Sequence, residues 1–70
     1  MKAITSHQKT KIIIYDVSYM SMDRGYQIYK KTGAILFGRV AKGEYNSFWF
    51  KFQTTDEANK FKNAVNTNTF

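Results

Sequence analysis

Residues 47–53 read Ser-Phe-Trp-Phe-Lys-Phe-Gln, and this alternation constrains the fold more than any other part of the chain. With the two-residue repeat of a β-strand, the three phenylalanines fall on one face, and Trp49 and Lys51 fall on the other. A face made of phenylalanines belongs in a hydrophobic core. The opposite face then presents a tryptophan beside a lysine on whatever side of the sheet stays uncovered.

The length of the chain limits it to a single small domain, residues 1–70. A chain of this size buries a small core, and the absence of cysteine excludes disulfides and thiolate metal sites. Aromatic residues make up 17% of the sequence, which suits a core built from a few large side chains. We therefore expect stability to come from aromatic packing or from association with another chain.

Three further segments are rich in β-branched and aromatic residues and are expected to be strands: residues 11–19, 26–30 and 34–40. The segments between them contain Asp-Arg-Gly, Lys-Thr-Gly and a glycine with an asparagine, which are typical of turns. Residues 1–10 are mixed in character, and two interpretations stay open for them, a flexible lead or a short extra strand.

The repeat changes from two to 3.6 residues after the last strand. Thr54 is a good N-cap, and Glu57 three residues later completes a capping box. Ala58, Phe61, Ala64 and Val65 then form one apolar stripe of a helix. The helix should end around residues 66–68, with residues 67–70 frayed.

These elements predict an α+β fold, a four-stranded antiparallel meander followed by one C-terminal helix (β-β-β-β-α). Loops of three to six residues are too short for parallel crossovers. The helix should cover Phe48, Phe50 and Phe52, and the other face should show Tyr29, Ile35, Phe37, Arg39, Trp49 and Lys51. A slip of one residue in segments 26–30 and 34–40 would reverse their side chains.

Catalysis is not expected from this sequence. The single histidine, His7, lies in the least structured segment, and Asp56 and Glu57 belong to the helix start. Asp16 falls in the middle of a predicted strand, where we expect it to pair with a lysine or arginine on an exposed face. No zinc-binding constellation and no glycine-rich phosphate loop is present in the sequence. We predict a non-enzymatic protein that needs no metal or cofactor.

The charge of the chain points to an acidic partner. Eleven Lys and Arg stand against five Asp and Glu, a formal net charge of +6. The longest apolar run, residues 12–15, is far too short to span a bilayer. The sequence therefore predicts a cytoplasmic protein without a membrane partner.

Single-stranded nucleic acid fits this chemistry, because phosphates bind cations and unpaired bases stack on flat rings. The predicted rings are Trp49, Phe37 and Tyr29, with Lys51 and Arg39 as the adjacent cations. Lys30, Lys31 and Lys42, on or beside loops, are predicted to be peripheral phosphate contacts.

The layout predicted for residues 11–65 resembles that of small single-strand-binding proteins, namely the Pur-type domains, the Whirly proteins and the transcriptional coactivators that bind single-stranded DNA. The resemblance implies single-strand binding by an open, basic sheet. Residues 48–65 also resemble the last strand and helix of pleckstrin-type peptide-binding domains.

Two functions stay open at this point, single-strand binding and a small inhibitor or adaptor, such as a phage protein, that binds an acidic protein through the same face. The apolar residues of that face also predict a homodimer.

Overall fold

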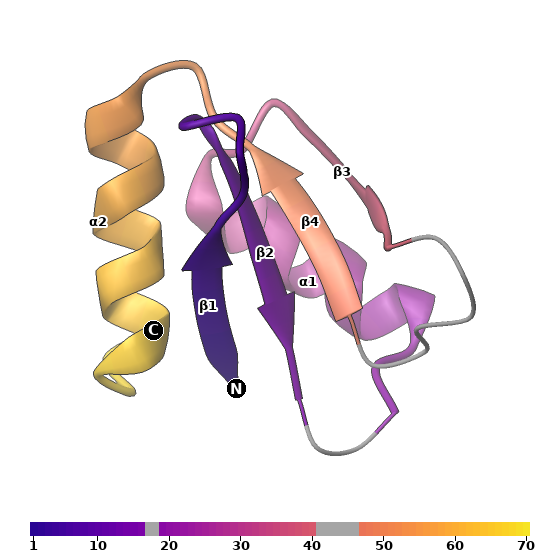
Figure 1. Cartoon of the computed structure of the whole chain (residues 1–70). Coiled ribbons are helices and arrows are strands. Elements are labelled where there is room, and N and C mark those ends of the chain that lie inside the picture. The colour runs from indigo at the N-terminus through magenta and orange to yellow at the C-terminus, as the bar shows by residue number, and fades with distance from the viewer. Residues whose placement is uncertain (17–18, 41–46) are drawn as a thin grey trace.

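The computed structural model describes residues 1–16, 19–40 and 47–70, which form one sheet and two helices in the order β-β-α-β-β-α (Figure 1). The elements are β1 (Lys2–Thr5), β2 (Lys11–Tyr15), α1 (Met22–Thr32), β3 (Leu36–Arg39), β4 (Ser47–Lys51) and α2 (Thr55–Asn66). The α+β class and the antiparallel four-stranded sheet are confirmed.

The strand order is β1-β2-β4-β3, so the predicted meander is wrong between β2 and β3. Both of these strands are antiparallel to β4, and they therefore run parallel to each other. The connection between them is the helix α1, and β4 later fills the gap in the sheet. This arrangement is a split β-α-β unit.

Helix α1 replaces the strand predicted at residues 26–30. The prediction of a single helix, at the C-terminus, is therefore also wrong. Ser21 caps its start, because the Ser21 hydroxyl accepts a hydrogen bond from the Arg24 N–H at 3.2 Å. Gly33 ends it in the left-handed conformation with φ of 76°. The buried positions Gly25 and Ile28 are three residues apart, which is one turn of a helix.

The C-terminal helix is confirmed with its cap. The Thr54 hydroxyl accepts a hydrogen bond from the Glu57 N–H at 3.2 Å, and it donates one to the Glu57 carboxylate at 3.0 Å. Ala58, Phe61 and Val65 are buried as the stripe predicts. Helix α2 therefore begins and packs as its local sequence indicates.

The amino-terminal segment contains the short strand that was one of its two interpretations. β1 pairs with β2 on one side, and helix α2 closes its other side. The Asn66 side chain accepts a hydrogen bond from the Ala3 N–H at 2.8 Å and donates one to the Ala3 carbonyl at 2.9 Å. This amide satisfies the edge of β1 as a neighbouring strand would.

Both helices lie on the same side of the sheet, with α1 behind it and α2 beside β1 in the view of Figure 1. The ring of Phe61 on α2 lies 5.5 Å from that of Phe50, and α1 packs Gly25 against the ring of Phe48. Phe48 and Phe50 have no exposed surface and Phe52 has 2%, so the core face predicted from the alternation is confirmed. None of the elements formed by the described residues covers the opposite face of the sheet.

A candidate nucleic-acid interface on the open sheet face

The register fixes which strand residues point away from the helices. Phe48 and Phe50 lie on the covered face. The residues that alternate with them in β4, which are Ser47, Trp49 and Lys51, lie on the other face, together with the residues paired with these three in the neighbouring strands. We call this second surface the open face. It consists of Lys2, Ile4, Lys11, Ile13, Tyr15, Leu36, Gly38, Ser47, Trp49 and Lys51.

An apolar row crosses the middle of the open face. Ile4 pairs with Ile13, Ile13 with Trp49, and Trp49 with Gly38, so the row runs through all four strands. Ile4 is 41% exposed, whereas Ile13 and Trp49 are half-buried. A neutral row of this kind offers a flat surface to an equally flat partner.

Lysines flank this row on both sides. Lys11 pairs with Lys51 along one side, one strand repeat of about 7 Å from the row. Along the other side, Lys2 pairs with Tyr15. The face therefore combines a neutral centre with cationic margins.

The indole of Trp49 packs against a glycine and is contacted by a cation. A Cβ atom on Gly38 would lie 2.7 Å from Cζ2 of the indole, so the ring occupies the space that a side chain there would take. The Lys11 ammonium lies 4.6 Å from the centre of the indole, a cation–π contact. The backbone and a neighbouring lysine thus set the position of the ring.

Lys51 is positioned by the turn between β1 and β2. Its ammonium donates a hydrogen bond to the Gln8 side-chain oxygen at 2.9 Å. Gln8 is held in turn, because its N–H donates to the Ser6 hydroxyl at 3.1 Å and its carbonyl accepts from the same hydroxyl at 2.9 Å. A neutral amide orients Lys51 without cancelling its charge.

The carboxylates of the described residues all lie away from the open face. Asp16 forms an ion pair with Arg24 of α1 at 3.2 Å, which confirms its basic partner, but its side chain is only 16% exposed and does not lie on an exposed face as expected. Asp23 lies in the first turn of α1, and Asp56 and Glu57 lie in the first turn of α2. Every charged side chain on the described part of the open face is therefore a cation.

Of the eight predicted binding residues, Trp49 and Lys51 lie on the open face. Phe37 and Arg39 were expected there, and this placement is wrong, because they pair with Phe50 and Phe48 on the face covered by the helices. The Phe37 ring lies 5.9 Å from that of Phe50. The register of β3 differs by one residue from the predicted one, which reverses every side chain of the strand.

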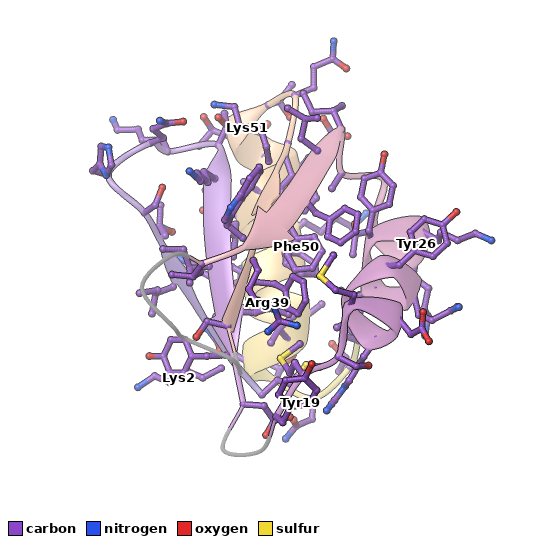
Figure 2. All side chains as sticks on the ribbon, turned by 90° about the vertical axis from the view of Figure 1, so that its right-hand side faces the viewer. Lys2, Tyr19, Tyr26, Arg39, Phe50 and Lys51 are labelled. Atoms are coloured by element: carbon purple, nitrogen blue, oxygen red, sulfur yellow. The ribbon has the colours of Figure 1, made fainter. Side chains whose placement is uncertain are left out.

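Arg39 instead joins the sheet to the segment before α1. Its Nη2 donates a hydrogen bond to the Met20 carbonyl at 2.8 Å, and its guanidinium lies 4.6 Å from the centre of the Phe48 ring. Figure 2 shows Arg39 near Tyr19, at the opposite end of the sheet from Lys51. A role in packing accounts for these contacts.

Tyr29, Lys30 and Lys31 were expected on or beside the sheet, and they belong to α1. Tyr29 stacks on Phe37 at 4.8 Å, and the two lysines occupy the last turn of the helix. The helix places all three in the layer on the other side of the sheet from the open face. Lys42 lies outside the described residues.

The prediction missed Lys11, Ile13 and Tyr15, although a signal for them is present in the sequence. The three residues alternate along β2, and the two intervening isoleucines are fully buried. The same two-residue repeat that separates Trp49 from the phenylalanines therefore separates this set from the core.

The described residues contain no group of three or more His, Asp or Glu side chains that could hold a metal ion. Neither of the two helices among the described residues is long and apolar enough to cross a membrane. Comparison of the chain with protein families, curated proteins and solved structures found no match.

Proposed function

We propose that this protein binds single-stranded nucleic acid, without catalysis, through the open face. The observation that carries the proposal is the arrangement of Trp49 with Lys11 and Lys51 on a surface whose described residues include no carboxylate. Bases would stack on the indole of Trp49 at the centre of the open face. Phosphates would meet the lysines at its margins.

The shape of the surface favours a single strand over a duplex. A protein usually reads duplex DNA with a helix or a two-stranded ribbon inserted in the major groove. Here both helices pack on the far side of the sheet, and their buried residues are part of the core. A broad sheet face instead leaves room for unpaired bases laid flat, with Trp49 at its centre.

The test uses Trp49 itself, because it is the single tryptophan of the chain. Titration with a labelled oligothymidine should quench its fluorescence, and a duplex of the same length should bind more weakly. Three lysines on the face, Lys2, Lys11 and Lys51, predict a slope of about −2 in a plot of log affinity against log salt. An absence of binding at low salt would overturn the proposal.

Matched variants locate the interaction. Lys11→Gln should weaken binding and reduce the salt slope by about 0.7, the value for one lost phosphate contact on a single strand. Lys60→Gln removes the same charge from α2 and should leave both quantities unchanged. Equal effects of the two substitutions would indicate non-specific attraction to a basic protein.

An acidic protein surface is the second candidate, and the exposed aliphatic side chains of the open face favour it. Leu36 is 59% exposed and Ile4 is 41% exposed, and such chains add contact area at protein interfaces but do not stack on bases. Ile4→Ser with Leu36→Ser should leave oligonucleotide affinity intact if bases stack on Trp49. A large loss of affinity in this double variant would count against the stacking geometry.

A further inference from the structure

Strand β3 forms an open edge of the sheet. The strand order β1-β2-β4-β3 leaves one of its sides without a neighbouring strand among the described residues. Figure 2 faces this edge, with β3 in front of the sheet and α1 to its right. The other edge, at β1, is closed by the Asn66 side chain, which bonds the N–H and the carbonyl of Ala3. Of the two edges, β3 is therefore the one that can accept a further strand.

The hydrogen bonds to β4 show which backbone groups of β3 point outward. The Val40 N–H donates to the Ser47 carbonyl at 3.3 Å, at the end of the β3–β4 ladder. Successive residues of an antiparallel strand direct these groups alternately to one side and to the other. The N–H and the carbonyl of Gly38, two residues before Val40, therefore point to β4, and those of Phe37 point to the open edge. Phe37 thus offers one donor and one acceptor to an added strand.

An aromatic cluster lies beside this edge, on the side of α1. The rings of Tyr26 and Tyr29, one helical turn apart, have centres 6.2 Å apart, and Tyr29 stacks on Phe37 at 4.8 Å. The Tyr26 ring also lies 6.3 Å from that of Phe37. Tyr26 is 47% exposed, so a partner side chain can pack on it. Tyrosine is enriched at protein interfaces, where its ring is buried and its hydroxyl forms hydrogen bonds.

The strand adds exposed aliphatic side chains of its own. Ile35 and Leu36, at its start, are both exposed, and Leu36 lies on the open face whereas Phe37 faces the helices. An extended peptide directs alternate side chains to opposite sides. One set would therefore meet Tyr26 and Phe37, and the other set would meet Leu36. The strand contains no proline or lysine, residues that commonly block edge strands.

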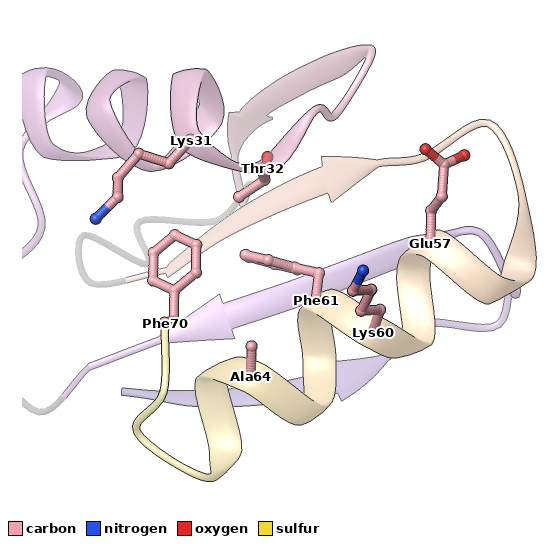
Figure 3. A pocket seen from close by; sticks show the side chains of 7 residues that line it. All are labelled: Lys31, Thr32, Glu57, Lys60, Phe61, Ala64 and Phe70. Atoms are coloured by element: carbon pink, nitrogen blue, oxygen red, sulfur yellow. The ribbon is translucent and has the colours of Figure 1, made fainter.

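The hollow of about 340 Å³ between the end of α1 and the face of α2 offers less to a partner (Figure 3). Its two lysines, Lys31 and Lys60, lie at opposite ends, with Phe70 and Phe61 between them. The rings of Phe61 and Phe70 already meet edge to face, 5.4 Å apart, and Phe61 is 5% exposed. Tyr26 beside β3 is therefore more accessible than the aromatic side chains of the hollow.

The charge beside the edge favours an acidic partner. Lys30 lies in the last turn of α1, and its ammonium lies 5.5 Å from the centre of the Tyr26 ring. Asp23 lies in the first turn of the helix, and Asp16 is paired with Arg24. Helix α1 thus presents a cation beside Tyr26, at the end of the helix that leads into β3, in a chain whose net charge is +6.

We propose that an extended acidic peptide segment of another protein adds to the edge of β3 as a further strand. Its backbone bonds the N–H and the carbonyl of Phe37, an apolar side chain packs on Tyr26, and a carboxylate meets Lys30. A second copy of this chain is disfavoured as the occupant, because it carries the same net charge of +6. The site does not depend on the function proposed for the open face.

The test is a titration of the full chain with the peptide acetyl-Glu-Val-Thr-Val-Thr-Val-Glu-amide, followed by ¹H–¹⁵N NMR without oligonucleotide. Shifts should saturate and concentrate in β3 and α1. Hydrogen exchange of the Phe37 amide should slow, and that of Gly38, already directed to β4, should change less. The same peptide N-methylated at its central amides keeps its charge but blocks the ladder, and it should not bind. Equal binding of both peptides, shifts centred on the open face, or no saturation at millimolar peptide would refute the proposal.

Variants of the chain separate ring from charge. Tyr26→Ala should weaken peptide binding about tenfold, as for an aromatic anchor of an interface, and Lys30→Gln about threefold, as for one exposed ion pair. Gln27→Ala, the next residue of α1 but on another side of the helix, should change nothing. Oligonucleotide affinity should stay constant in Tyr26→Ala, so the two proposals can fail separately. Protection of the Phe37 amide that is present without peptide and rises with chain concentration would assign the edge to a second copy instead.

Discussion

Two glycines stand where an aromatic ring takes the space of a side chain. Gly25 of α1 faces the ring of Phe48, and Gly38 of β3 faces the indole of Trp49. A Cβ atom would lie 2.6 Å from the Phe48 ring in the first case and 2.7 Å from the indole in the second. The first contact holds a helix against the sheet, and the second positions the central ring of the open face.

We predict that Gly25→Ala destabilises the protein although alanine is the better helix former. Overpacking a core costs about 1–3 kcal/mol, which should exceed the gain of about 1 kcal/mol from helix propensity. Phe48 has no exposed surface into which its ring could move. Urea unfolding should give a lower free energy for Gly25→Ala and a slightly higher one for the exposed Gln27→Ala. A stabilised Gly25→Ala would show that α1 packs differently.

We predict that Gly38→Ala displaces the indole of Trp49 and thereby weakens oligonucleotide binding. The strand itself tolerates alanine, so far-UV circular dichroism should change little, while the emission maximum of Trp49 should shift. Gly33→Ala is the control, because Gly33 has a φ of 76° and no atom within 4 Å of an added Cβ. It should lower stability through backbone strain, by about 1–2 kcal/mol, without altering Trp49 emission. Unchanged emission in Gly38→Ala would contradict the contact.

At the scale of elements, the two helices differ in how far their own residues determine that they are helical. Helix α2 was predicted because its cap and its stripe lie within its own residues. The local sequence of helix α1 instead predicts a turn and a strand, because Asp23-Arg24-Gly25 is typical of a turn and Tyr26, Ile28 and Lys30 suit alternation. The contact of Gly25 with Phe48, from a distant strand, supports the helical alternative.

We predict that Asn66→Ala separates α2 from β1. The substitution leaves the N–H and the carbonyl of Ala3 without the partners they have in the native fold, at a cost of about 1–3 kcal/mol. Amide hydrogen exchange should accelerate in β1 before the rest of the sheet. Asn59→Ala, an exposed site of the same helix, should keep native exchange rates and gain slightly in stability. Equal protection of β1 in both variants would contradict the proposed role of Asn66.

At the scale of the whole molecule, the acidic side chains of the described residues are confined to the helix side of the sheet. The described carboxylates lie at the helices and at Asp16, while Lys2, Lys11 and Lys51 share the open face. Two open faces packed together would place the lysines of both copies opposite one another. Charge therefore opposes the homodimer that the apolar residues of this face predict.

We accordingly expect sedimentation equilibrium to show monomers at low salt and micromolar concentration. If the open faces do associate, high salt should strengthen the dimer by screening the lysines, and Lys11→Glu should strengthen it further. A dimer that is stable at low salt and insensitive to salt would show that the lysines do not oppose association, and it would support the homodimer prediction.

The sequence alone determined the core face of β4, the capped helix α2 and the position of Trp49 and Lys51 opposite the phenylalanines. Each of these follows from a repeat or a cap contained within a few residues. The tertiary structure decided the helical state of α1, the strand order and the register of β3, which moved Phe37, Arg39 and Tyr29 off the open face. These features depend on contacts between distant segments, such as Gly25 with Phe48 and Gly38 with Trp49.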